Sequence, residues 1–202
     1  MVLRAIFKMI LGYIRVSLGT FRTVYLVGGM ENEKGLGAKW REDITPRLVE
    51  MGFKVLNPCQ FEPEQLKGRQ TTRLPKKIKT YDGKTIKPKH WHELKKAPVG
   101  SSYYKRFKSY MSPIIHFDLD VVSYESDFLI CNWTQGAAAG GGTHGEVTLA
   151  HKLGKEVYMV VQEGIVVPGW IQGCVTEDGM VSSFDELFYI LEKRIERRKK
   201  AA

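Results

Sequence analysis

The feature that most constrains the fold is the alternation of short apolar runs with longer amphipathic runs, which begins at Thr23. Short runs of apolar, β-branched and aromatic residues between turn signals predict buried strands, whereas an apolar residue at every third or fourth position predicts a helix. Strands that alternate with helices form a mostly parallel sheet covered on both faces, so the sequence predicts a doubly wound α/β fold of the Rossmann or flavodoxin-like type. The predicted strands are "TVYLVGG" (23–29), "FKVLNP" (53–58), "DFLICNW" (127–133) and "EVYMVV" (156–161).

Turn and cap residues set the bounds of the predicted helices. Gly52 ends the first helix, and Pro113 suits the first turn of the second. Ser183, with Glu186 three residues later, forms a capping box at the start of the last helix. The predicted helices cover 35–52, 113–125, 145–154 and 183–198.

The chain of 202 residues, 43% of them hydrophobic, is long enough to bury a core and short enough to favour one domain with an insertion. We expect an N-terminal amphipathic extension over 1–22, a single domain over 23–202, and a basic insertion at about 62–112 within it. Lys8 and Arg15 divide the extension into apolar pieces too short to span a bilayer. The extension is either a basic helix that docks on a partner subunit or membrane surface, or a segment of little structural consequence.

The net charge of +9 is concentrated in the insertion and in the tail "EKRIERRKK". Residues 67–108 hold fourteen Lys or Arg against two acids, Asp82 and Glu93, and "TYDGKTI" predicts a small hairpin around Asp82 and Gly83. Aromatic residues among the lysines favour a segment that meets anionic ligand groups and bases, with a disordered tether as the alternative. Contact of the basic segments with nucleic acid or a membrane surface is a further hypothesis, and a solvated face is the simpler interpretation of the tail.

The cysteines and histidines predict neither disulfides nor a metal site. Cys59, Cys131 and Cys174 are far apart and odd in number, which fits a reducing cytoplasm. The histidines lack partners at metal-ligand spacing, and we interpret them as surface or satisfied core residues. We therefore expect no metal site.

Two glycine-rich turns follow strands of the predicted sheet: "GGM" after the first strand and "NWTQGAAAGGGTHGE" after the third. Ligands of open parallel sheets bind outside the carboxyl ends of the strands, so both turns are expected at a binding site. The second turn delivers Thr143 and, three residues later, Glu146. One interpretation is a capping box, and the other is a phosphate or sugar cradle that carries a catalytic carboxylate.

A glycosyl reaction explains why a carboxylate would stand at this position. A carboxylate can attack an anomeric carbon while a second acid serves the leaving group, and Asp118 and Asp120 are the candidates for that second acid. Tyr25, in the first strand, could hydrogen-bond to Glu146. Residues of the surrounding turns are expected to contact the substrate: Gly28, Gly29, Met30, Trp40, Asn132, Gly142 and Thr143.

The pieces "VYLVGGMEN", "WRE", "DLDVVSYESDFLI" and "GTHGEVTLAHKLGKEVYMV" occur in this order over most of 23–163. This stretch resembles the nucleoside 2-deoxyribosyltransferases and the related nucleoside 5′-monophosphate N-glycosidases. The resemblance implies that Glu146 is the covalent nucleophile, that Tyr25 is its hydrogen-bond partner, and that an aspartate of "DLD" handles the proton of the leaving base. It also implies a homo-oligomer without a cofactor.

The sequence departs from the family pattern at two places. Asp118 lies nine residues before Asp127 and Asp120 lies seven before it, on either side of the family's usual spacing, so both stay candidates, with Asp118 favoured. Some transferases carry a further acid where this chain has Gly140, which leaves the choice of base open. Asp127 itself is expected to be a structural residue that opens a strand.

Three functions follow from these observations. The first is transfer of 2-deoxyribose between a nucleoside and a free nucleobase through a glycosyl-glutamate intermediate. The second is hydrolysis of nucleoside monophosphates with the same nucleophile, with Thr143 and the glycine turn accepting the phosphate. The third is a nucleotide- or nucleic-acid-binding module without catalysis.

Overall fold

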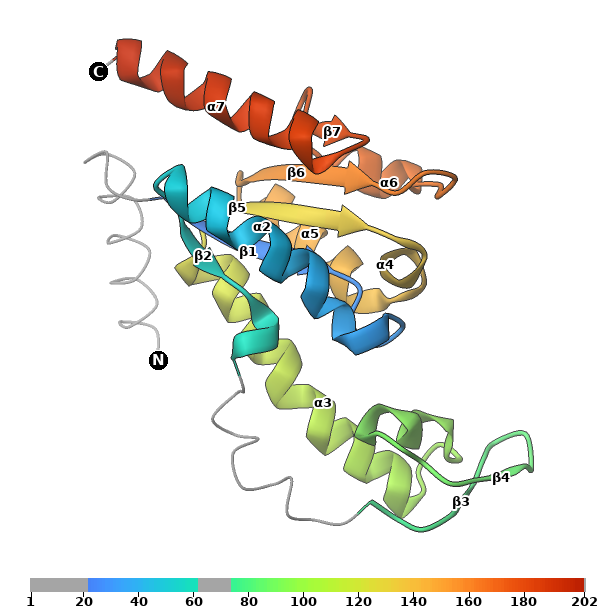
Figure 1. Ribbon diagram of the computed structural model, residues 1–202. Helices are drawn as coiled ribbons and strands as arrows, with labels where there is room; N and C mark the ends of the chain where they lie inside the picture. The colour runs from blue at the N-terminus through green and yellow to red at the C-terminus, as the bar shows by residue number, and fades with distance from the viewer. Residues whose placement is uncertain (1–21, 62–73, 202) are drawn as a thin grey trace. The chain divides into compact units, whose positions relative to one another are not determined.

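The computed structural model describes residues 22–61 and 74–201 (Figure 1). The chain divides into two compact units. The first contains residues 22–60 and 119–201, and the second lies within 61–118. The predicted N-terminal extension, apart from Arg22, lies outside the described residues.

The first unit is built on a five-stranded parallel sheet with the order β2-β1-β5-β6-β7. The strand order reverses at β1, because β2 pairs on one side of it and β5 pairs on the other. The four predicted strands are confirmed, and the short β7 at the far edge is an addition. The strands are β1 (Thr23–Gly28), β2 (Lys54–Leu56), β5 (Phe128–Trp133), β6 (Glu156–Val161) and β7 (Met180–Val181).

Helices cover both faces of this sheet, which confirms the doubly wound class (Figure 1). α2 (Ala38–Glu50) and α7 (Phe184–Ala201) pack on one face, where alternate strand residues form the main core. α5 (Gly141–Lys152) covers the opposite face. The buried residues of the core beneath α2 and α7 are Val24, Leu26, Ile44, Leu48, Phe53, Phe128, Ile130, Tyr158, Val160, Leu187, Phe188 and Leu191.

The start of α5 differs from the prediction. The helix begins at Gly141, with Gly140 as its N-cap residue in an extended conformation, rather than near Gly145. A second short helix, α4 (Gln135–Ala139), occupies most of the preceding turn, where Thr134 caps it by accepting a hydrogen bond from the Ala137 amide at 3.1 Å. The glycine run is therefore helical, because tertiary packing overrides its low helix propensity.

The helix predicted to begin at Pro113 is also longer than expected. α3 spans Ser102–Asp120, so Pro113 lies inside it rather than in the first turn. A π-helical turn, η6 (Val121–Glu125), continues α3 up to β5. A proline in the interior leaves one carbonyl without its helical amide, and the flanking residues carry the helix through it.

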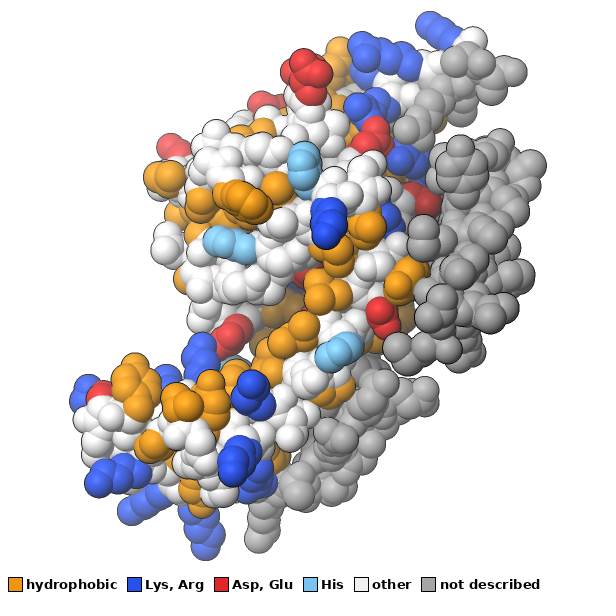
Figure 2. All heavy atoms as spheres, turned by 180° about the vertical axis from the view of Figure 1, so that it is seen from behind, with side chains coloured by type: hydrophobic (Ala, Val, Ile, Leu, Met, Phe, Trp, Pro, Cys, Tyr) orange, Lys and Arg blue, Asp and Glu red, His pale blue; other side chains and the backbone are white. Residues whose placement is uncertain are grey.

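The second unit contains the predicted hairpin. β3 (Ile78–Lys79) and β4 (Thr85–Ile86) are antiparallel and enclose Asp82 and Gly83, which confirms that prediction. The 3-10 segment η5 (Trp91–Lys96) and the first turns of α3 pack with the hairpin. Its small core consists of Ile78, Leu94 and Ala97, against which Ile86, Trp91, Tyr103, Tyr104 and Phe107 pack. In Figure 2 Lys and Arg side chains gather over this unit.

The remaining elements complete the first unit. The loop after β1 contains η1 (Lys34–Gly37), the loop after β2 contains η2 (Pro58–Gln60), and α6 (Gly169–Gln172) follows β6.

The predicted capping box at the start of α7 is formed in part. Ser183 accepts a hydrogen bond from the Glu186 amide at 3.2 Å, while the Glu186 carboxylate accepts from the Ser182 amide and not from the Ser183 amide. No helix among the described residues has the length and apolar character needed to cross a membrane.

Candidate active site

The central contact of the candidate site joins Tyr25 of β1 to Glu146 of α5. The Tyr25 hydroxyl donates a hydrogen bond to Oε1 of Glu146 at 3.1 Å. Both side chains are buried, with exposed fractions of 1% for Tyr25 and 8% for Glu146. Tyr25 alternates with the core residues Val24 and Leu26 and therefore faces α5. A buried carboxylate held by a buried phenol is the pairing that the sequence predicted.

The capping-box interpretation of Thr143 and Glu146 is wrong. The N-cap residue of α5 is Gly140, and no side chain caps this helix. Thr143 is the third residue of α5 and Glu146 is the sixth, so Glu146 lies beyond the first turn, where unpaired amides would favour a carboxylate. The helix start therefore does not stabilise the Glu146 anion.

A buried cation that the sequence did not reveal lies beside this pair. Arg41 of α2 is fully buried and donates to the carbonyl oxygens of Leu26 (3.2 Å), Gly28 (3.1 Å) and Gly37 (2.9 Å). Burial lowers the pKa of Arg41, and the nearby Cys59, Tyr25 and Glu146 act in the opposite direction. A guanidinium stays charged in proteins, so Arg41 supplies a fixed positive charge to which the Glu146 carboxylate is electrostatically coupled.

Cys131 of β5 is also close to Glu146 and is unsuited to be the nucleophile. The thiol is fully buried, and burial together with the Glu146 charge raises its pKa far above the ordinary value. A thiol with a raised pKa remains protonated at neutral pH. Cys131 is therefore an unreactive thiol beside the Glu146 carboxylate.

The two turns at the strand ends are locked to each other through Glu33. Its carboxylate accepts a hydrogen bond from the Thr134 hydroxyl, at the start of α4. A Cβ at Gly136 would lie 2.3 Å from Oε1 of Glu33, so a larger residue there would displace the Glu33 side chain from its place. The turn after β1 and the turn after β5 therefore form one rigid assembly at the carboxyl edge of the sheet.

The predicted substrate-contacting glycines have packing roles in this assembly. A Cβ at Gly29 would lie 2.8 Å from the Ala137 amide nitrogen, and one at Gly28 would lie 3.1 Å from the Asn132 carbonyl oxygen. Backbone thus fills the space that these two glycines leave. Gly142, in contrast, is exposed and nothing surrounds it within 4 Å.

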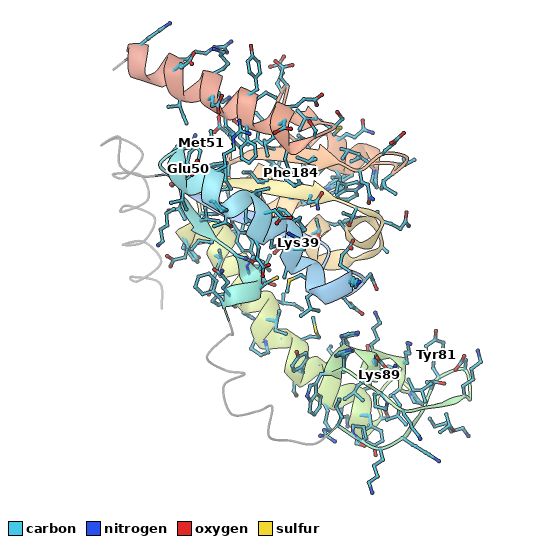
Figure 3. All side chains as sticks on the ribbon, viewed as in Figure 1. Lys39, Glu50, Met51, Tyr81, Lys89 and Phe184 are labelled. Atoms are coloured by element: carbon cyan, nitrogen blue, oxygen red, sulfur yellow. The ribbon has the colours of Figure 1, made fainter. Side chains whose placement is uncertain are left out.

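The other predicted contact residues are distributed around the same edge. Asn132 and Met30 are half-buried at the ends of β5 and β1, and Thr143 is buried in the first turn of α5. Trp40 stacks on Phe184 with ring centroids 5.8 Å apart, and the Arg41 guanidinium lies 4.6 Å from its ring centroid. Figure 3 labels Phe184, which lies at the start of α7 beside α2. Trp40, predicted as a substrate contact, thus packs against the start of α7 and the Arg41 guanidinium.

Asp118 and Asp120 both lie in the last turn of α3. Asp120 belongs to the first unit together with Glu146 and is exposed, whereas Asp118 is half-buried and closes the second unit. Asp127 has the structural role that was expected, because its carboxylate accepts a hydrogen bond from the Thr23 amide at 2.6 Å and so ties the start of β5 to β1.

The histidines near the site do not form a metal centre. Within 22–61 and 74–201 no group of three or more His, Cys, Asp and Glu side chains could hold a metal ion. His144, on the first turn of α5, stacks on Trp133 with ring centroids 5.1 Å apart, and its Nε2 atom is buried without a hydrogen-bond partner. A ring packed in this way helps to fix the start of α5 against β5.

Comparisons with known proteins give structural similarity alone. No protein-family model matches the chain, and no curated protein sequence matches it. Among solved structures, the chain is similar to a 2-deoxyribosyltransferase from Bacillus psychrosaccharolyticus, with a TM-score of 0.44 and 13% identity over 82% of this chain and 90% of that one. It is also similar to the CMP N-glycosidase BcmB of Clostridium botulinum, with a TM-score of 0.43 and 16% identity over 85% and 99% of the two chains.

Proposed function

We propose that the protein transfers 2-deoxyribosyl groups between nucleobases through a covalent glycosyl-glutamate intermediate on Glu146. The observation that carries the proposal is the buried hydrogen bond between the Tyr25 hydroxyl, within β1, and Oε1 of Glu146 on the helix α5 that covers this face of the sheet. A carboxylate that is buried beside a cation and fixed by a phenol is prepared for nucleophilic attack on an anomeric carbon.

The first half-reaction forms an ester and releases a base. A carboxylate oxygen of Glu146 attacks C1′ of the nucleoside, the N-glycosidic bond breaks, and its electron pair passes to the departing base nitrogen. That nitrogen takes a proton from a carboxylic acid, for which Asp118 is the first candidate and Asp120 the second. The hydrogen bond from Tyr25 holds Glu146 in one orientation during the attack.

The second half-reaction restores the carboxylate. A nitrogen of the incoming base attacks C1′ of the glycosyl ester, the bond from C1′ to Glu146 breaks, and the aspartate takes up the proton that the base nitrogen loses. Met30, Asn132, Gly142 and Thr143 are the proposed contacts for the sugar and base, since they lie around the same edge of the sheet. The locked turns around Gly29 and Gly136 would keep these contacts in place.

A nucleoside 5′-monophosphate N-glycosidase is the second candidate, with water in place of the incoming base. The observation that favours it is the start of α5, where three glycines precede Thr143 and no side chain caps the helix. Amides at such a start are available to a phosphate group. A binding module without catalysis is the third candidate, and it requires no nucleophile at Glu146.

One assay separates these candidates. The purified chain is incubated with deoxyribonucleosides and their 5′-monophosphates, with and without a second free base, and the products are separated by chromatography. New nucleosides that depend on the added base identify the transferase, and free base with free sugar regardless of acceptor identifies the hydrolase. Glu146→Gln should abolish either reaction while the fold remains. Turnover by Glu146→Gln at the parent rate would falsify the covalent mechanism.

A further inference from the structure

The second unit carries most of the net charge of the protein on a folded scaffold of its own. Residues 74–118 contain eleven Lys and Arg against three acids, Asp82, Glu93 and Asp118, whereas the whole chain has a net charge of +9. Its hairpin is fixed by a hydrogen bond from the Thr80 amide to the Lys84 carbonyl at 2.8 Å and by one from the Tyr81 amide to the Lys96 carbonyl at 2.8 Å. The charges are thus displayed on ordered elements, not on a solvated tail.

Two of the three acids of this unit are engaged locally. Asp82 pairs with Lys84 at 3.0 Å and accepts from the Thr80 hydroxyl, and these contacts lower its pKa to about 2. Glu93 accepts a hydrogen bond from the Lys89 amide at 3.3 Å. These two acids therefore stabilise the local fold and leave most of the lysines available to an external anion.

Most lysines of the unit are exposed and lack an ion pair within the described chain. Eight exposed lysines of the unit make no ion pair with any carboxylate among residues 22–61 and 74–201, namely Lys76, Lys77, Lys79, Lys87, Lys89, Lys96, Lys105 and Lys108. They come from the hairpin, the segments before and after it, η5 and α3, and so do not follow a single helix face. Figure 2 shows Lys and Arg side chains over this unit, and Figure 3 labels one of them, Lys89. So many unpaired cations on a small scaffold indicate a polyanionic partner.

An exposed aromatic ring stands among these lysines. Tyr81, in the turn between β3 and β4, is 75% exposed (labelled in Figure 3), and its backbone is fixed by the bond to Lys96. The Trp91 ring, in contrast, already packs against residues of its own unit. Tyr110 stacks on it with ring centroids 5.8 Å apart, and the Arg106 guanidinium lies 5.1 Å from its centroid. Tyr81 is therefore the ring of this unit that presents its face to a base.

We infer that the second unit binds single-stranded nucleic acid, with the lysines contacting phosphates and Tyr81 stacking on a base. Cationic grooves with exposed aromatic rings bind single strands, because only an unpaired base offers its face to a side chain. An anionic membrane surface would also attract the lysines, so the test includes vesicles as the alternative. The inference does not rest on the proposed glycosyl chemistry, because neither Tyr81 nor the eight lysines take part in it.

The test measures the binding of the full chain to fluorescently labelled single-stranded DNA and RNA of about 20 nucleotides, a length that exceeds the usual site size. Anisotropy titrations at several salt concentrations between about 50 and 200 mM give the affinity and its salt dependence. The variant Lys79→Gln, Lys87→Gln, Lys89→Gln removes three charges from the unit. Affinity should fall at least about tenfold, and the slope of log affinity against log salt should become smaller by about 2.

A matched control removes the same charge elsewhere. Lys34, Lys54 and Lys152 are exposed lysines of the first unit, and replacing all three by glutamine should change affinity less than about twofold. Tyr81→Ala should weaken single-strand binding about five- to hundredfold with an unchanged salt slope, and Tyr81→Phe should restore it. Glu146→Gln should bind like the parent, which separates this result from the fate of the proposed function.

Several outcomes would overturn the inference. Equal losses in the two lysine triples would show a diffuse effect of net charge instead of a site. Tighter binding to a duplex of the same length, insensitive to Tyr81→Ala, would exclude the single-strand assignment. Sedimentation with phosphatidylserine vesicles in the absence of oligonucleotide binding would assign the lysines to a membrane surface. Circular dichroism of each variant, unchanged from the parent, confirms that the loss is not unfolding.

Discussion

At the residue scale, the site depends on one hydrogen bond between buried groups. Tyr25→Phe removes the donor from Oε1 of Glu146 and leaves the ring in place. We expect turnover in the proposed reaction to fall by up to about a hundredfold, since the nucleophile loses its fixed orientation, and stability to fall by about 1–3 kcal/mol. Steady-state kinetics and thermal melting measure both effects.

The control for this variant is Tyr158→Phe. Tyr158 is equally buried, at 1% exposure, but it belongs to the core on the opposite face of the sheet. Its replacement should leave turnover at the parent value. If the two variants lost turnover to the same extent, the effect of Tyr25→Phe would reflect the packing of the sheet and not the contact with Glu146.

Arg41 carries the second residue-scale prediction. Arg41→Met leaves the carbonyls of Leu26, Gly28 and Gly37 without their donor, so the free energy of unfolding should fall by at least about 3 kcal/mol. Arg47, on the same helix, is a control whose guanidinium is at the surface, where it pairs with Asp185 and Glu192 and lies 4.2 Å from the Phe188 ring centroid. Arg47→Met should cost less than about 1 kcal/mol in urea unfolding.

The fate of these residues shows what a sequence can predict. The predicted pairing of Tyr25 with Glu146 is present because residues alternate between the two faces of β1, which turns Tyr25 toward α5, the helix that carries Glu146. Arg41 could not be found in this way, since an arginine in an amphipathic helix is expected to be exposed. Its burial depends on Gly37, which adopts a φ of +65° and lies against the Gly29 carbonyl. This turn depends on tertiary contacts, so no periodic pattern in the sequence predicts it.

At the element scale, the two turns at the strand ends are limited by backbone packing. Gly29→Ala would place a Cβ 2.8 Å from the Ala137 amide nitrogen, where only a shift of the backbone can relieve the clash. We expect a loss of about 1–3 kcal/mol, measured by chemical unfolding. Gly145→Ala is the contrasting change, because nothing lies within 4 Å and alanine favours the helix, so stability should rise by about 0.5–1 kcal/mol. A neutral result for Gly29→Ala would show that the turns are not locked.

Elements also differ in how well the sequence predicts them. The four long strands and the C-terminal helix follow from their periodicity, and the structure has all of them. The start of α5 was misplaced because glycines disfavour helix, and the start of α3 because Pro113 suits a first turn. In both places the helix is extended by packing against neighbours, which local propensity does not contain.

At the scale of the whole molecule, the chain carries two separate cores. The core of the first unit joins α2, α7 and three strands, whereas that of the second unit consists of Ile78, Leu94 and Ala97 with aromatic residues around them. The second core is small, and small cores supply little net stability. The second unit should therefore open more readily than the sheet that carries Tyr25 and Glu146.

Hydrogen exchange of the full chain tests this separation. Leu94 is fully buried in the second unit, and Leu94→Ala should cost that unit about 2–5 kcal/mol, enough to raise amide exchange throughout 74–118. Exchange in β1 and β5 should stay at the parent rate, because none of their residues belongs to this core. Leu48→Ala, in the core of the first unit, should have the opposite pattern. Faster exchange in both units after either change would mean that the two cores unfold together. The second unit would then have no stability independent of the first.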